Sequence, residues 1–321
     1  MKNKQLFWGI GSSLAMMVLI LDGKTALLGA QQGVQLCLMT VVPSLFPFFF
    51  LTNLLTSSLA GVPSRVLRPL GKLFGVPGGT EPLLLAGLLG GYPAGAQCVA
   101  ESYRAGRISR QDGAFLLTFC NQPGPAFLFG MVAFLFPRRW MVWLLWAIVL
   151  LSALVTARFS GGLSERAVAL TAKRSRPPLS AAIRATVAVC GWVVIFRVIL
   201  AFLSRWLLWL VPAEGQALLT GLLELTNGCL LLGSIPDMRL RFVLAVVLLT
   251  FGGLCVGMQT ASLLYGLPLK SYLMGKLLQT AIALAMAMAA AWGIWLPMVM
   301  VFLLFALVRQ KRGSVSRKAG V

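Results

Sequence analysis

The chain has 321 residues, of which 59% are hydrophobic and 11% are charged. Soluble domains contain roughly 25% charged residues, so this composition excludes an ordinary soluble fold and predicts a membrane protein. The net charge is +20, and the basic residues lie in short segments between apolar stretches, which favours contact with anionic lipid head groups over nucleic acid. The chain has no histidine, which excludes histidine-dependent catalysis.

The N-terminal segment 1–32 is predicted to hold the first transmembrane helix. Its apolar run, 6–22, follows Lys2 and Lys4 and could be interpreted as a signal peptide. The run lacks a good cleavage site and more apolar stretches follow it, which favours an uncleaved helix. A second span is expected at about 33–58, because a bilayer core needs roughly 20 apolar residues per helix.

The apolar stretch 82–100 has a centre that a straight helix tolerates poorly. Because Gly and Pro interrupt helices, this stretch is predicted to form a re-entrant hairpin rather than a span. The next stretch, 113–136, is expected to break at 121–125, where the sequence is NQPGP, and a full span follows at 140–157. The residues that interrupt the hairpin are Gly90, Gly91, Pro93 and Gly95.

The second half begins after the most polar part of the interior. This part, 158–180, is rich in Lys and Arg and is predicted to be a basic linker on the cytoplasmic side. The later elements are expected to be a span at 183–211, a second hairpin at 216–233, a helix at 241–265 that breaks at Gly252 and Gly253, and two helices within 272–308 that turn near 293–297.

Two short sequences recur in the same order in both halves. Gly-Leu-Leu begins at residues 87 and 221, and Leu-Leu-Thr-Phe begins at residues 116 and 248. The predicted fold is therefore all-α and polytopic, with repeat 1 at 33–157 and repeat 2 at 181–292, each in the order span, re-entrant hairpin, broken helix, span. Three crossings per repeat would invert the second relative to the first, as in many secondary transporters. The segment 293–321 adds a C-terminal helix and a basic tail.

Both termini are expected in the cytoplasm. This orientation places most of the 28 Lys and Arg residues, Lys276 among them, on the cytoplasmic side, as the positive-inside rule requires. Arg197 is left inside the membrane, where an ionisable residue usually faces a cavity or a partner. Glu224 could be its ion-pair partner or could bind a coupling ion; Arg197 could instead contact a ligand or extend to the membrane surface.

The helix breaks are the predicted solute site. Non-helical backbone at membrane depth is tolerated only where protein or a water-filled cavity satisfies it, and free amides at half-helix N-termini favour anions. The alternative is that Gly and Pro only kink these helices or allow close packing. The predicted substrate-binding residues are Gly91, Tyr92, Pro93, Gly95, Asn121, Gln122, Gly124, Arg197, Asn227, Gly252, Gly253 and Gln259.

The sequence carries no sign of an enzyme. No GxxxxGK[ST] motif is present, which argues against ATP-driven pumping by this chain alone. An intramembrane hydrolase needs a base beside a nucleophile, and the chain has no histidine and only 8 acidic residues. The six cysteines lie in apolar stretches without a CxxC pair, so no metal or other cofactor is expected.

An ordered set of motifs extends from about residue 33 to residue 280. The set is PSLFPFF from Pro43, GYPAGA from Gly91, NQPGP from Asn121, FGG from Phe251, and then Gln259. It resembles the YlbJ family of sporulation integral membrane proteins, also called SpoVV. That family is grouped with proteins that carry the nucleoside-recognition Gate domain and is related to concentrative nucleoside transporters, so the resemblance implies hairpins and discontinuous helices.

The resemblance also implies a function. Family members are implicated in moving dipicolinate from the mother cell towards the forespore, which implies the outer forespore membrane, and an oligomer or other sporulation membrane proteins as partners. Two positions depart from the family pattern: Gly90 replaces a Ser, and Gln97 replaces a Lys. If that Lys contacts an anionic substrate in relatives, its replacement weakens the inference of the same substrate.

Two other functions are considered. One is transport of a nucleoside or another small solute by the same architecture. The other is a non-transporting membrane scaffold that organises a sporulation complex. A scaffold needs no interrupted helices or polar groups at the membrane midplane, so the predicted breaks count against it.

Overall fold

The computed structural model describes residues 2–59, 64–76, 78–161 and 177–293. The elements in these ranges are all helical, as the sequence predicts. The principal helices of the first half are α1 (Lys2–Leu21), α2 (Gly23–Leu36), α3 (Val42–Leu59), α4 (Arg68–Phe74), α5 (Glu81–Leu89), α6 (Ala94–Arg104), α7 (Arg110–Leu117), α8 (Pro125–Gly130) and α9 (Arg139–Ser160). Those of the second half are α10 (Pro178–Trp206), α11 (Ala213–Leu223), α12 (Leu225–Leu232), α13 (Met238–Phe251), α14 (Gly253–Leu263) and α15 (Leu269–Trp292).

Five helical segments of the described chain are long and apolar enough to cross a membrane, so the protein is a multi-pass membrane protein. The described apolar part of α1, Gly9–Leu21, is shorter than these five. The candidate spans are Gly23–Leu59, Arg139–Ser160, Pro178–Trp206, Met238–Leu263 and Leu269–Trp292.

The first span begins earlier than the sequence suggests. α2 starts at Gly23 rather than near 33, because the Asp22 side chain caps the new helix by accepting a hydrogen bond from the Thr25 backbone N–H at 3.3 Å. One π-helical turn, Cys37–Val41, joins α2 to α3, so that Gly23–Leu59 forms one long segment. The boundary expected between 32 and 33 therefore falls inside a helix.

Apart from α4, which lies between α3 and α5 and has no helical counterpart of its length in the second half, the spans and helix pairs follow one another in the same order in both halves. In the first half the span α2–α3 is followed by the helix pair α5 and α6, by α7 and α8 with non-helical backbone between them, and by the span α9. In the second half the span α10 is followed by the helix pair α11 and α12, by α13 and α14, and by the span α15. The predicted interruption at 121–125 is confirmed. The predicted interruption at Gly252 and Gly253 is a single residue, Gly252, within a continuous 26-residue span.

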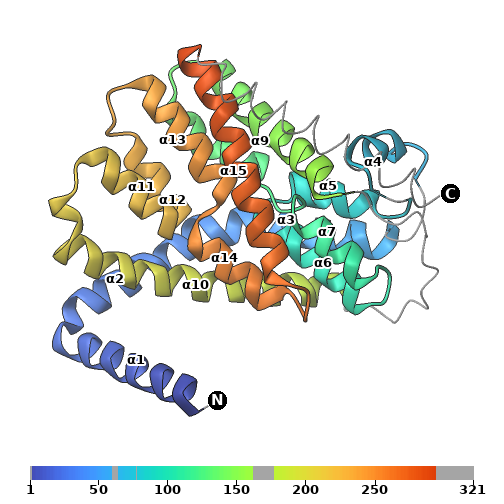
Figure 1. Ribbon diagram of the computed structural model, residues 1–321. Coiled ribbons are helices and arrows are strands. Elements are labelled where there is room, and N and C mark those ends of the chain that lie inside the picture. The colour runs from blue at the N-terminus through green and yellow to red at the C-terminus, as the bar shows by residue number, and fades with distance from the viewer. Residues whose placement is uncertain (1, 60–63, 77, 162–176, 294–321) are drawn as a thin grey trace.

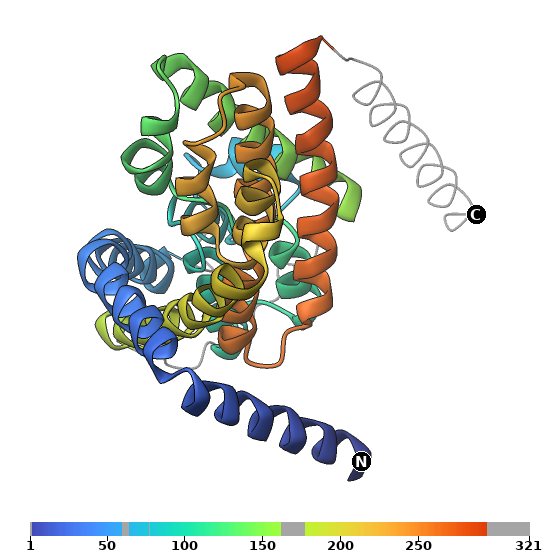
Figure 2. The ribbon, with the colours of Figure 1, turned by 90° about the vertical axis from the view of Figure 1, so that its left-hand side faces the viewer.

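The spans form two groups in space. α10 lies along α2 at the lower side of Figure 1, whereas α9, α13 and α15 stand upright beside one another. α1 extends away from the rest of the molecule in Figure 2. The pair α5–α6 contacts α3 and α14, and the pair α11–α12 contacts α10, α13 and α14. The expected linker at 158–180 and the C-terminal helix within 293–321 lie mainly outside the described residues.

The contact between α2 and α10 depends on small residues. A Cβ atom on Gly29 would lie 2.9 Å from the Val198 Cα, and one on Gly33 would lie 2.8 Å from the Val194 Cα. Two glycines four residues apart let the helix backbones approach closely, the usual way in which helices associate in a membrane.

Glycines also let the two helices of each pair pack closely against each other. In the first pair, a Cβ on Gly95 would lie 2.7 Å from the Gly87 Cα and 1.9 Å from the carbonyl oxygen of Cys120, which precedes the first break. In the second pair, a Cβ on Gly228 would lie 2.1 Å from the Gly221 Cα. Gly253, just after the second break, packs in turn on Gly221, since its Cβ would lie 2.8 Å from the Gly221 carbonyl oxygen. The same arrangement of pair and break therefore occurs in both halves.

A candidate solute cavity between the helix breaks

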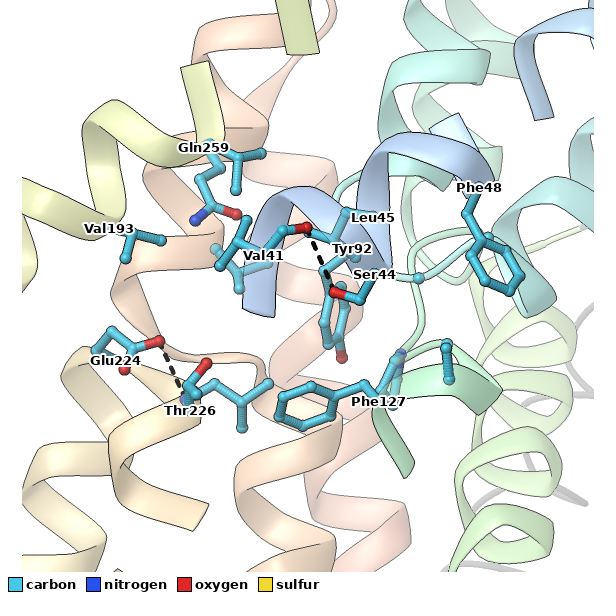
Figure 3. A pocket seen from close by; sticks show the side chains of 18 of the residues that line it. Val41, Ser44, Leu45, Phe48, Tyr92, Phe127, Val193, Glu224, Thr226 and Gln259 are labelled. Atoms are coloured by element: carbon cyan, nitrogen blue, oxygen red, sulfur yellow. Dashed lines mark hydrogen bonds between the residues drawn. The ribbon is translucent and has the colours of Figure 1, made fainter. Parts of the chain in front are cut away.

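A cavity lies where the two helix pairs and the two breaks converge (Figure 3). Its walls come from α3, α10, the turns of both pairs, the backbone of the first break, and α14. The lining residues that can form hydrogen bonds through their side chains are Ser44, Tyr92, Glu224, Thr226 and Gln259. Most of the other lining side chains are apolar, for example Leu45, Phe48, Phe127, Val193 and Val256.

Two glycines with positive φ interrupt the helices beside the cavity. Gly91 has φ 80° and lies at the turn between α5 and α6, and Gly252 has φ 84° and ends α13. A side chain strongly disfavours positive φ, so glycine is required for these two turns. The Gly252 backbone lies against the ring of Tyr92, to which an added Cβ would come within 3.3 Å. The first turn and the second break therefore meet at Tyr92.

The structure places five of the thirteen residues singled out by the sequence on the cavity wall. They are Gly91, Tyr92, Gly124, Gln259 and Glu224. Of the others, Gly252 contacts Tyr92, Gly253 and Gly95 pack between helices, and Pro93 precedes α6. For Gly95 and Gly253 the structure thus favours the close-packing alternative.

Asn121 and Gln122 are fully buried and do not line the cavity. The Asn121 Oδ1 atom accepts a hydrogen bond from the Ala96 backbone N–H at 3.4 Å, and its Nδ2 donates to the Thr260 Oγ1 at 3.3 Å. Asn121 thereby connects the first break to the first turn of α6 and to α14. Gln122 is held by Gln279 of α15, with which it exchanges two hydrogen bonds of 3.0 and 2.7 Å.

Glu224 is the charged residue of the cavity wall, and it is 3% exposed. Its carboxylate caps α12 by accepting hydrogen bonds from the backbone N–H groups of Thr226 at 3.0 Å and Asn227 at 2.8 Å, and the Thr226 bond is drawn in Figure 3. The Glu224 carboxylate is therefore held at the N-terminal end of α12, where the helix dipole and the free backbone N–H groups stabilise negative charge.

Arg197 and Glu224 are connected, although not directly. The Asn227 side chain donates to the Glu224 carboxylate through its Nδ2 and accepts from the Arg197 guanidinium through its Oδ1. Arg197 also donates to the Gln32 Oε1 at 2.9 Å. A direct ion pair is one of the possibilities that the sequence leaves open; in the structure Asn227 lies between the two groups. Arg197 does not line the cavity.

Behind the cavity wall the structure buries a lysine, Lys276, that the sequence pattern does not single out. The positive-inside count places Lys276 on the cytoplasmic side, and the structure shows that its side chain lies in the protein interior, 1% exposed in α15. Its Nζ donates to the Tyr92 Oη and to the Gln279 Oε1, both at 3.2 Å. Gln279 also donates to the Val149 carbonyl oxygen and the Ser152 Oγ of α9. The signal in the sequence is a lysine about two turns inside the segment that forms α15, with a glutamine three residues later.

Similarity to a curated protein supports the resemblance deduced from the motifs. The chain is 35% identical over 106 residues to the sporulation integral membrane protein YlbJ of Bacillus subtilis (strain 168). The match covers 32% of this chain and 26% of that protein, so the chain spans about a quarter of the length of its curated relative. No family model matches the chain, and no solved structure matches it. The chain is thus similar, over about a third of its length, to a sporulation integral membrane protein.

Proposed function

We propose that this protein carries a small solute across a membrane and that the solute passes through the cavity of Figure 3. The observation that carries the proposal is the position of the cavity, where two helix pairs and two helix interruptions meet among the candidate spans. Interrupted helices within a membrane protein supply backbone groups to a solute site, as in secondary transporters. A scaffold would need no such cavity. No part of the proposal involves enzyme catalysis.

We further propose that the two halves are inverted repeats and that α5–α6 and α11–α12 are re-entrant hairpins. The common element order and the matching glycine contacts support this interpretation. Both termini would then be cytoplasmic. Under this orientation a cysteine introduced at Ser234 should react with an impermeant thiol reagent outside the cell, and one at Ser164 should not.

The first candidate solute is a small aromatic anion such as dipicolinate. The similarity to a sporulation protein supports this class, and the mainly apolar cavity wall suits a flat ring. The N-terminus of α14 has no side-chain cap, so its positive end is available to stabilise an anion. The protein would then act in the outer forespore membrane. Its proposed partners are other sporulation membrane proteins or further copies of this chain.

A second candidate is a neutral, nucleoside-like solute. The observation in its favour is the charge of the cavity wall: the lining residues include the Glu224 carboxylate and neither Lys nor Arg. A carboxylate can accept hydrogen bonds from sugar hydroxyls, whereas it repels an anion at short range.

Uptake by purified protein in liposomes distinguishes these candidates. Radiolabelled dipicolinate and a panel of nucleosides are offered separately, and empty liposomes are the control. Uptake of dipicolinate above that control supports the anion, and uptake of a nucleoside alone supports the second candidate. If none of the solutes enters and none exchanges across the membrane, the transport proposal is wrong and the scaffold becomes the better interpretation.

A further inference from the structure

A second chamber lies where α3, α6 and the start of α10 meet, and its walls are mainly polar. It differs in this respect from the solute cavity, whose walls are mainly apolar. Its polar lining residues come from α3, from α6 and from the turn after α6. They are Asn53, Thr56, Ser57, Glu101, Ser102 and Arg107, of which Ser57, Glu101 and Arg107 are partly exposed and the others buried.

The chamber and the cavity are neighbours along the same helices. α3 lines the cavity at Phe48 and the chamber at Asn53, and α10 lines the cavity at Val189 and the chamber at Ala181. With a rise of 1.5 Å per residue, these pairs lie about 8 and about 12 Å apart along their helices. α6 begins directly after cavity residue Tyr92, and its C-terminal part lines the chamber. We call the buried ground between the two spaces the α3–α6–α10 seam.

The seam is closed in this structure, and hydroxyl groups lie along it. Thr52 is 8% exposed and lies against the cavity wall, since a Cβ on Gly90 would come within 2.9 Å of its Cγ2. Thr56 lies one turn further along α3, on the chamber wall, and its Oγ1 donates to the Thr52 carbonyl oxygen at 2.8 Å. Polar side chains therefore continue from the cavity wall to the chamber.

Gln97 crosses the seam from α6 to α10. Its side chain is 2% exposed, and its Nε2 donates to the Ala181 carbonyl oxygen at 3.0 Å. Its Oε1 has no hydrogen-bond partner among the described residues. A buried acceptor without a partner is costly and uncommon in folded proteins. One half of this amide thus holds two helices together, and the other half is available to a hydrogen-bond donor.

We propose that the solute moves between the cavity and the polar chamber along the α3–α6–α10 seam, and that Gln97 closes this passage by holding α6 to α10. When the passage opens, the Gln97 Oε1 accepts a hydrogen bond from water or from the solute. This inference rests on the proposed transport function and adds the route by which the solute leaves the cavity. The chamber lies near Arg107 and the start of α10, so under the proposed orientation the route leads to the cytoplasm.

Thiol labelling tests the closure without a known solute. The six native cysteines are replaced by alanine, and Val193→Cys places a single thiol on the buried cavity wall. An impermeant methanethiosulfonate reagent is applied to right-side-out and to inside-out membrane vesicles. Adding Gln97→Ala should raise the labelling rate roughly fivefold from one face only, the effect of losing one hydrogen bond. Gln31→Ala, which removes an exposed amide on α2, should leave the rate unchanged.

Uptake into liposomes tests the route. Ser57→Trp fills the chamber from a partly exposed position, whereas the adjacent Ser58 is exposed and does not line the chamber. With dipicolinate or a nucleoside, whichever the wild type takes up, Ser57→Trp should abolish uptake and Ser58→Trp should not reduce it.

The outcomes separate this inference from the transport proposal. A rise in labelling from both faces indicates general loosening, and no rise means that Gln97 does not close the passage; either result overturns the inference. Wild-type uptake by Ser57→Trp also overturns it, because the solute then leaves the cavity by another route. A wild type that takes up no solute overturns the transport proposal instead, and the labelling experiment still decides whether Gln97 closes the seam.

Discussion

At the scale of single residues, the sequence identified the polar groups of the interior better than it identified their roles. Amides beside Gly and Pro in apolar stretches pointed to Asn121, Gln122 and Gln259, and all three are buried. Only Gln259 lines the cavity, because the side-chain direction at a helix break depends on contacts that are distant in sequence. Lys276 was missed for a related reason: whether a lysine near a helix end reaches the surface depends on the helices around it.

The hydrogen bonds of Asn121 make a stability prediction. In Asn121→Leu the Ala96 N–H and the Thr260 hydroxyl lose a buried partner, and unpaired buried groups cost about 1–3 kcal/mol each. We expect a clearly lower unfolding temperature in detergent. Gln31→Leu, the replacement of an exposed amide on α2, should unfold like the wild type. Normal stability of Asn121→Leu combined with lost uptake would instead assign Asn121 to solute binding.

At the scale of elements, hydropathy and Gly and Pro positions predicted helix type and order well. The spans, the helix pairs and the interruption at 121–125 follow from apolar length and from residues that break helices. Helix boundaries were predicted less well, since Asp22 begins a new helix inside the expected first segment. The glycine contacts that close each pair could not be read from the sequence, where a packing glycine and a hinge glycine look alike.

These contacts predict which glycines tolerate a methyl group. In Gly228→Ala the new Cβ would meet the Gly221 Cα at 2.1 Å, so α11 and α12 must separate, and overpacking of this kind costs about 1–3 kcal/mol. Gly191→Ala in α10 is the control, because nothing lies within 4 Å of its Cβ position and Ala favours a helix. Thermal unfolding should show a lower transition for Gly228→Ala only. Equal transitions would mean that the pair is not closed by this contact.

At the scale of the whole molecule, the fold brings together segments that are far apart in the sequence. The cavity wall draws on α3, the turn after α5, the first break, α10, the turn before α12, and α14. The repeated short motifs predict that the two halves meet at their interruptions; in the structure, Gly252 of the second interruption lies against Tyr92 of the first helix pair, whose ring lines the cavity. Its volume and its lining could not be predicted, because both depend on how the long spans pack against the helix pairs.

The central claim is that a solute passes through this cavity, and filling the cavity tests it most directly. Val193 lies on α10, is 4% exposed and lines the cavity, whereas Val187 on the same helix is 66% exposed. With both variants present in liposomes at the same level, Val193→Trp should abolish uptake of the transported solute, and Val187→Trp should leave it at the wild-type rate. Wild-type uptake by Val193→Trp would contradict the account, because a solute that passes an occupied cavity does not use it.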